Sequence, residues 1–207
     1  LAVCLGPKKA DEIVRQALSM GTDKGILITD QAADGSCALA IAKILVTAIK
    51  NFDFDLIFTG QRGIDGDQGL VGAAIAELLN IPQICLARKF ELSKDCKSVK
   101  VHRPVEGQTV VIESNLPVLI TAQKGLNKPR WATMPMILKA RKKSLEYKTL
   151  KDLDLDPSEF GEKARKLKLC QMSLPPARPE VKMIEGESAQ EVAAECVRLL
   201  HKEAKVI

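Results

Sequence analysis

The segment from Gly60 to Gly72 carries the residues best suited to chemistry. Five glycines recur at every third position of GQRGIDGDQGLVG, interleaved with Asp65 and Asp67. Glycine lets the backbone take positive φ angles and approach a ligand closely. An apolar strand precedes the segment and an apolar helical pattern follows it, so free N–H groups at a helix N-terminus would face a phosphate. The spacing fits neither a Walker A loop nor GxGxxG. Nucleotide binding and a ligand-free capped turn are both open on these residues alone.

The second candidate is a basic stretch over residues 124–151, with nine Lys or Arg and one Glu. Its net charge of 9 − 1 = +8 leaves 5 − 8 = −3 for the rest of the chain. Nucleic-acid binding would need more basic surface and more than the 3% aromatic residues present. We expect Met134, Met136 and Ile137 to lie in a loop beside Trp131, as a docking patch that flanking cations steer toward an acidic partner. Core packing under a loop is the alternative.

Other kinds of chemistry have little support in the sequence. The six cysteines form no CxxC pair or zinc spacing, which favours a reducing compartment and no disulfide framework. Neither histidine, His102 or His201, has a nucleophile or acidic partner nearby in sequence. No apolar run reaches the roughly 18–20 residues of a membrane span. We therefore expect neither an enzyme active site, a metal site nor membrane insertion.

An alternation of strands and helices positions the Gly-rich segment. Expected strands cover residues 1–5, 25–29, 55–60, 84–92 and 116–122, and expected helices cover 11–20, 37–51 and 70–80. This order predicts an α/β fold with a parallel sheet covered on both faces. Residues 60–72 would then lie at the carboxyl end of a strand, where open α/β sheets bind ligands. Residues 89–122 predict an antiparallel extension with turns at 93–98 and 105–108.

Three parts are expected along the 207 residues. Residues 1–123 would form an α/β domain, 124–151 a partner-recognition loop and basic segment, and 152–207 a C-terminal arm. The arm is rich in Pro and charge up to Glu185, and a helix should follow Ser188, which with Glu191 forms a capping-box pattern. The chain opens on Leu in an apolar strand, so we expect the first element of the sheet to be missing.

Nearly the whole chain resembles the β subunit of electron transfer flavoproteins. The segment LNKPRWATMPMILKARKK (126–143) is similar to the long family signature LNxPRYATLPxIxKAxKK. Further similar segments are VCLGP (3–7), ALSMGTDKGI (17–26), GQRGIDGDQGLVGAAIAELLNIPQ (60–83), VEGQTVVIESNLPVLITA (105–122) and LPPARPEVK (174–182). From this resemblance we expect the family's first strand, with the loop and helix that follow it, to be missing here.

The resemblance implies an electron carrier and not an enzyme. It implies a heterodimer with an FAD-bearing α subunit that accepts electrons from acyl-CoA or other flavin dehydrogenases, as in fatty acid β-oxidation, and passes them to a quinone oxidoreductase or other acceptor. The implied fold is an adenine-nucleotide α-hydrolase-like (Rossmann-like) domain with a C-terminal arm on the α subunit. The β subunit would hold AMP, or a second FAD in electron-bifurcating members. The compartment would be a bacterial cytoplasm or a mitochondrial matrix.

The family's functional positions can be carried over residue by residue. The implied cofactor-binding residues are Leu5, Gly6, Gly60, Gln61, Arg62, Gly63, Ile64, Asp65, Gly66, Asp67, Gln68, Gly69, Leu70 and Val71. The implied partner-docking residues are Arg130, Trp131, Ala132, Thr133, Met134, Pro135, Met136, Ile137, Leu138 and Lys139. Met134 stands where the family has the Leu that enters a hydrophobic pocket of the dehydrogenase.

One departure bears on which nucleotide is bound. The loop reads IDGDQGLVG, nearer to the IDGDTAQVG of bifurcating members than to the IDDDxNQTG of AMP-binding members, which favours FAD. Gln68, Gly69 and Leu70 replace Thr-Ala-Gln, so phosphate contacts would fall mainly to backbone N–H groups. A nucleotide-binding scaffold without redox function is the remaining alternative.

Overall fold

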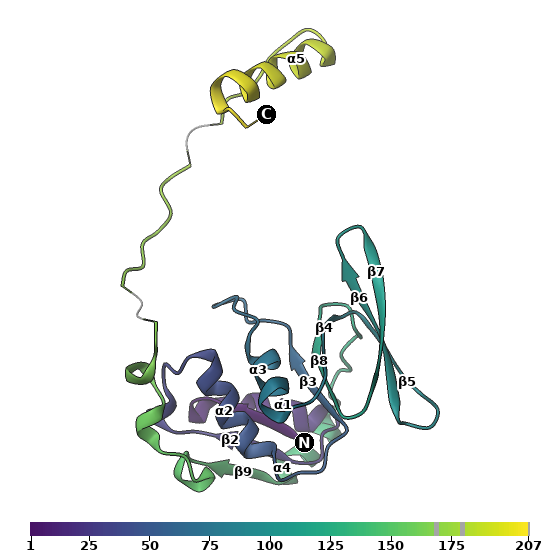
Figure 1. Ribbon diagram of the computed structural model, residues 1–207, viewed down its shortest axis with the longest axis vertical. Helices are drawn as coiled ribbons and strands as arrows, with labels where there is room; N and C mark the ends of the chain where they lie inside the picture. The colour runs from purple at the N-terminus through teal and green to yellow at the C-terminus, as the bar shows by residue number, and fades with distance from the viewer. Residues whose placement is uncertain (168–169, 179–180, 207) are drawn as a thin grey trace. The chain divides into compact units, whose positions relative to one another are not determined.

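A computed structural model describes residues 1–167, 170–178 and 181–206 of the chain (Figure 1). The chain divides into two compact units, Leu1–Leu167 and Lys168–Ile207, each of which is described by itself. The first unit contains both candidate sites. Its elements are β1 (Ala2–Leu5), α1 (Asp11–Met20), β2 (Gly25–Ile28), α2 (Ala38–Ile49), β3 (Leu56–Gly60), α3 (Val71–Leu79), β4 (Gln83–Ala87), β5 (Lys89–Leu92), β6 (Ser98–Val105), β7 (Gln108–Asn115), β8 (Val118–Ala122), α4 (Met134–Lys142) and β9 (Leu145–Lys148).

Two parallel sheets of three strands form the centre of the first unit, with orders β1–β2–β9 and β3–β8–β4. The expected α/β fold with parallel strands is therefore confirmed. Strand β9 was not expected, because Leu145–Lys148 is short and lies inside the basic stretch. Its pairing with β2, in which Ile26 lies opposite Glu146, depends on residues about 120 positions away in the sequence.

Alternating side chains of β2 bind two helices to opposite faces of the first sheet. Ile26 and Ile28 pack in one buried cluster with Ile44 of α2, while Leu27 packs in another with Val14 of α1. Successive side chains of a strand point to opposite faces, so α1 and α2 cover different sides. Each fully buried Ile or Leu contributes about 1.5–3 kcal/mol relative to an exposed one. Leu45 of α2 also packs against the cluster shared by α3 and β8, which joins the two sheets through one helix.

The strand expected over 84–92 is two strands. β4 ends at Ala87 in the parallel sheet, and β5 begins at Lys89 in the antiparallel sheet β5–β6–β7. Leu86 takes a φ of 64°, and its N–H donates to Thr121 Oγ1 of β8 at 3.0 Å. This irregularity turns the chain from one sheet into the other. The antiparallel extension itself is confirmed, with the two expected turns between its strands.

The first unit extends beyond the expected boundary at residue 123. Leu150, Leu153 and Phe160 are buried in the cluster beneath α2, although residues from 152 onward were expected to form an arm. Gly161 follows at a φ of 80°, and its N–H donates to Ser36 Oγ at 2.8 Å. Residues 150–161 therefore close one side of the core.

The second unit contains helix α5 (Ala189–Leu199), continued by a π-helical turn over Leu200–Ala204. Ser188 Oγ accepts the N–H of Glu191 at 3.3 Å, so the expected helix start is confirmed. Within the helix, Arg198 donates to both carboxylate oxygens of Glu195, at 2.6 and 2.7 Å. The described residues 170–178 carry no helix or strand, as the Pro-rich composition predicts.

Candidate functional site

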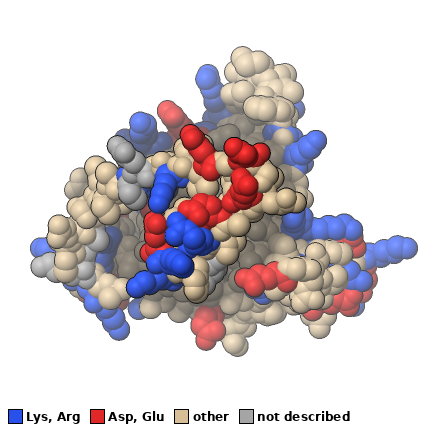
Figure 2. All heavy atoms as spheres, turned by 90° about the horizontal axis from the view of Figure 1, so that it is seen from above, with Lys and Arg blue, Asp and Glu red and all other residues tan. Residues whose placement is uncertain are grey.

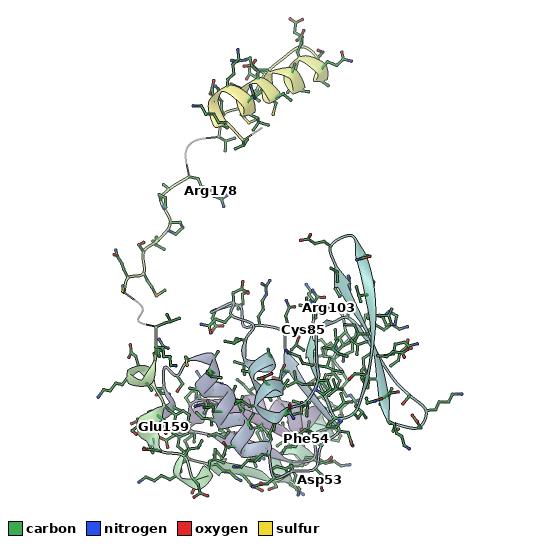
Figure 3. The ribbon with its side chains drawn as sticks, viewed as in Figure 1. Asp53, Phe54, Cys85, Arg103, Glu159 and Arg178 are labelled. Atoms are coloured by element: carbon green, nitrogen blue, oxygen red, sulfur yellow. The ribbon has the colours of Figure 1, made fainter. Side chains whose placement is uncertain are left out.

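The Gly-rich loop, residues 60–72, leaves the carboxyl end of β3 and enters α3 as expected. In Figure 3, Asp53 and Phe54 lie just before the opposite end of β3. A Cβ atom added at Gly60 or at Gly66 would meet nothing within 4 Å. The backbone at both glycines is therefore open to a ligand.

Gly72 has a different role from the open glycines. A Cβ atom there would lie 2.6 Å from Thr59 Oγ1 and 2.9 Å from Thr121 Cγ2. Only a residue without a side chain lets α3 approach β3 and β8 this closely. The N-terminus of α3 is thereby fixed directly beside the end of β3.

The N-terminus of α3 offers unpaired donors. Its N-cap residue is Leu70, and no side chain among the described residues caps the helix. The first turn contains no acidic residue, so the positive end of the helix dipole is not neutralised locally. Thr59 Oγ1 is also buried nearby without a hydrogen-bond partner in the described part of the chain. These donors fit the phosphate of a nucleotide.

The charged side chains of the loop are held by local contacts. Arg62 forms a two-pronged ion pair with Asp67, with Nε–Oδ1 at 2.9 Å and Nη1–Oδ2 at 3.1 Å. Asp67 takes a φ of 48°, and its N–H donates to the carbonyl of Gly63 at 3.0 Å. The Asp65 carboxylate lies over Gly63, 2.5 Å from where a Cβ would be. Both carboxylates are exposed and are suited to accept hydrogen bonds from ribose hydroxyls.

Leu5 and Gly6 occupy the end of a different sheet. Leu5 is the last residue of β1, and the N–H of Gly6, which follows it, donates to the carbonyl of Ile28 on β2 at 3.0 Å. The Gly-rich loop belongs to the β3–β8–β4 sheet, so the two expected parts of the cofactor site share carboxyl strand ends but not one sheet.

The docking segment, residues 130–139, is largely exposed. Trp131 is 93% exposed, Met134 69% and Leu138 53%, which is unusual for apolar side chains of this size. The expected loop at Met134, Met136 and Ile137 is wrong, because α4 begins at Met134. Thr133 is the N-cap and Pro135 lies in the first turn, a combination typical of helix starts.

A groove separates the docking segment from α1. It has a volume of about 710 Å³ and is lined on one side by Gln16 and Met20, and on the other by Arg130, Trp131 and Ile137. Both apolar and polar side chains therefore line its walls. Such a groove offers room for part of a partner protein beside the exposed Trp131.

Two cations that the sequence did not single out tie α1 to α4. Arg15 donates to the carbonyls of Ala140 and Lys143, each at 3.1 Å. Lys143 Nζ donates in return to the carbonyls of Leu18 and Thr22. Sequence separations of 121 to 128 residues leave no local signal that could have predicted these bonds.

Tyr147 of β9 joins this arrangement through Asp11. Its hydroxyl donates to Asp11 Oδ2, while Arg15 Nε lies 3.6 Å from Asp11 Oδ1. The hydrogen bond to the Asp11 carboxylate raises the pKa of Tyr147, because the bond holds the protonated hydroxyl.

Metal and membrane sites find no support in the described residues. No group of three or more His, Cys, Asp or Glu side chains there is placed to hold a metal ion. No helix of that part is long and apolar enough to cross a membrane. Figure 2 shows Lys and Arg side chains intermingled with Asp and Glu on the face in view, so charge of one sign does not cover it.

Comparison with known proteins shows which family and which relatives this chain is similar to. The family model described as "Electron transfer flavoprotein domain" matches residues 1–153. The chain is 41% identical over 207 residues to an electron transfer flavoprotein subunit beta of Bacillus subtilis, covering all of this chain and 78% of the relative. It is 33% identical to the Caffeyl-CoA reductase-Etf complex subunit CarD of Acetobacterium woodii, again over all of this chain and 78% of the relative. A subunit beta of Mus musculus is 37% identical over 75% of this chain and 61% of its own length.

Proposed function

The chain belongs to the electron transfer flavoprotein family, and from that premise we propose that it is a β subunit working with a flavin-bearing α subunit. The pair accepts electrons from an acyl-CoA dehydrogenase or a related flavin dehydrogenase. It passes them to a quinone oxidoreductase or another acceptor. When bound, FAD supplies the electron-accepting and electron-donating chemistry, while this chain binds, orients and docks. A bacterial cytoplasm or a mitochondrial matrix is the proposed compartment.

An adenine nucleotide is the proposed ligand of the Gly-rich loop. The observation that carries this proposal is the uncapped N-terminus of α3, fixed beside the end of β3 by Gly72. Backbone N–H groups of the first turn of α3 would bind phosphate, and Thr59 Oγ1 adds a buried hydroxyl. Asp65 and Asp67 would accept from ribose hydroxyls. Leu5 and Gly6 would line the neighbouring strand end.

FAD is favoured over AMP as that nucleotide. The loop sequence IDGDQGLVG is nearer to the form in electron-bifurcating members than to the AMP-binding form. A second FAD in this chain would make bifurcation the function of the complex. The AMP-holding carrier is the alternative, and both use the same donors at α3.

The docking segment is the proposed binding site for the electron donor. Met134 and Trp131 are exposed at the start of α4, where no described residue of this chain covers them. Met134 would enter an apolar pocket of the donor dehydrogenase. Burying an apolar side chain of this size contributes about 1.5–3 kcal/mol, enough to govern a transient encounter.

Nucleotide content tests the proposal directly. The protein is co-expressed with its α subunit, and the ligands released by heat are counted as FAD and AMP per heterodimer. Two FAD and no AMP would support the bifurcating form, and one FAD with one AMP would support the AMP-holding carrier. A complex with no bound nucleotide would contradict both and favour a scaffold without redox function.

A further inference from the structure

Helix α4 is too short and too exposed to be fixed by apolar packing alone. It has nine residues, and Ala140 is its only buried residue. Met136 and Ile137 are half-buried, while Met134 and Leu138 point their side chains largely into solvent. Isolated helices of this length are marginal in water, so tertiary contacts must hold α4 in place.

Arg15 supplies one such contact at the C-terminal end of α4. Its Nη1 atom lies 3.1 Å from the Ala140 carbonyl, 3.4 Å from that of Arg141 and 3.1 Å from that of Lys143. The last carbonyls of a helix have no partner within the helix, and the dipole there is negative. A guanidinium at this place satisfies these acceptors and the dipole together.

Lys143 makes the reciprocal contact at the C-terminal end of α1. Its Nζ atom lies 3.1 Å from the Leu18 carbonyl and 2.5 Å from the Thr22 carbonyl. Lys143 is half-buried, whereas the neighbouring Lys139 and Lys142 are exposed. Each helix therefore donates a cation to the end of the other.

Asp11 contacts and orients Arg15, and Tyr147 in turn donates to Asp11. The Asp11 carboxylate lies 3.6 Å from Arg15 Nε and accepts the hydroxyl of Tyr147 on β9. The end of α4 is thus connected through Arg15 and Asp11 to a strand of the parallel sheet. The exposed start of α4 lies at the opposite end of the same short helix.

We propose that Arg15 and Lys143 are positioning residues that hold α4 in the geometry in which Met134 meets the electron donor. This inference rests on the proposed docking function of residues 130–139. Arg15 also lines the groove beside Trp131, and hydrogen exchange within α4 separates its hold on the helix from a direct contact with the donor. Losing either bond set would let α4 move or fray, and a donor would then meet a smaller fraction of binding-competent molecules, which raises the apparent dissociation constant in proportion.

The test compares Arg15→Met and Lys143→Met with Lys24→Met in the full heterodimer. Lys24→Met is the matched control, because it removes one exposed cation just beyond the end of α1 and outside residues 124–151. Two quantities are measured at 0.15 M salt, where exposed charges beyond about 8 Å are screened. The first is hydrogen exchange of the α4 amides. The second is KM and kcat with a short-chain acyl-CoA dehydrogenase reduced by butyryl-CoA as the probe donor.

We expect exchange of α4 amides to rise about tenfold in both test variants, as for loss of a charge-assisted hydrogen bond. KM for the donor should rise about threefold to tenfold with kcat unchanged, because only the competent fraction falls. Lys24→Met should change neither quantity. Arg15→Lys and Lys143→Arg keep a donor and should recover part of the effect, and they serve in place of a methionine variant that does not fold.

Three outcomes would overturn the proposal in distinguishable ways. Unchanged exchange in α4 for both test variants would show that the two cations do not hold the helix. Faster exchange without a rise in KM, while Met134→Ala does raise KM, would separate the helix contacts from donor docking. No change of KM in any variant, Met134→Ala included, would contradict the proposed docking function itself and the positioning role with it.

Discussion

The Gly-rich loop and the docking segment are held in place by different means. Main-chain geometry fixes the loop, because Gly72 lets α3 pack tightly on β3 and β8 and the candidate ligand donors are N–H groups. Side-chain cations fix the docking segment, since Arg15 and Lys143 bind the ends of α4 and α1. A rigid main-chain site suits a bound nucleotide, whereas an exposed helix held by side-chain hydrogen bonds suits a partner that binds transiently.

Phe160→Ala should have the largest effect and would loosen both regions together. Phe160 is 4% exposed in the cluster beneath α2, so the cavity should cost about 3–5 kcal/mol of the free energy of unfolding. Proteolysis of this chain in rising urea measures the loss. Phe160→Leu keeps most of the volume and should cost under about 1.5 kcal/mol. Equal stability of Phe160→Ala and wild type would show that residues beyond 152 do not belong to the core.

Gly72→Val should damage the Gly-rich loop and leave donor docking intact. Its side chain would collide with Thr59 and Thr121, an overpacking that costs about 1–3 kcal/mol and displaces the start of α3. The free energy of unfolding and the bound nucleotide should both fall, while KM for the donor stays near wild type. Gly66→Ala, placed in open space, is the control for the free energy of unfolding alone, which should stay near wild type. A rise in donor KM comparable to that of Met134→Ala would mean that the two regions are not independent.

Met134→Ala should weaken donor docking and leave the Gly-rich loop intact. Met134 is 69% exposed, so its truncation should leave the free energy of unfolding within about 0.5 kcal/mol of wild type. Loss of its burial in the donor should raise KM about tenfold, the equivalent of roughly 1.4 kcal/mol. Stopped-flow reduction by the donor measures the change in KM, and Met134→Leu should keep KM near the wild-type value. Wild-type kinetics for Met134→Ala would remove the docking role of this side chain.

A smaller effect concerns the pH dependence of the docking segment. The hydrogen bond to Asp11 raises the pKa of Tyr147. The contribution of this hydrogen bond to the stability of the folded chain is therefore complete below pH 10 and is lost as the pH rises through the raised pKa. Tyr147 is the single tyrosine of the chain. The difference in tyrosinate absorbance between wild-type and Tyr147→Phe complexes follows its titration. Asp11→Asn should return the midpoint toward 10, and an unchanged midpoint would exclude Asp11 as the cause.

The features that the sequence predicted well are those encoded locally. The loop between β3 and α3 could be predicted because glycine spacing and a switch from strand to helix pattern lie within 25 residues. The helix start at Met134 also carried a local signal, in Thr133 and Pro135, which the loop interpretation did not use.

Features that depend on distant pairing could not be predicted. β9 is a strand because β2 binds it, and Arg15 meets Ala140 across 125 positions. The break between β4 and β5 follows from the left-handed backbone at Leu86, a residue that rarely adopts it. Tertiary contacts determine the strand β9, the Arg15–Ala140 bond and the break at Leu86. A single sequence does not reveal which distant residues come into contact.

The assignment of the nucleotide site to the Gly-rich loop is tested most directly by the nucleotide content of Gly60→Val beside Met134→Ala, each in the full heterodimer. A side chain at Gly60 meets nothing within 4 Å of its Cβ, so the fold should accept it while the approach of a ligand to the backbone is blocked. We expect Gly60→Val to lose the nucleotide of this chain and Met134→Ala to keep it. Full nucleotide content in a folded Gly60→Val complex would contradict the assignment of the site to the Gly-rich loop.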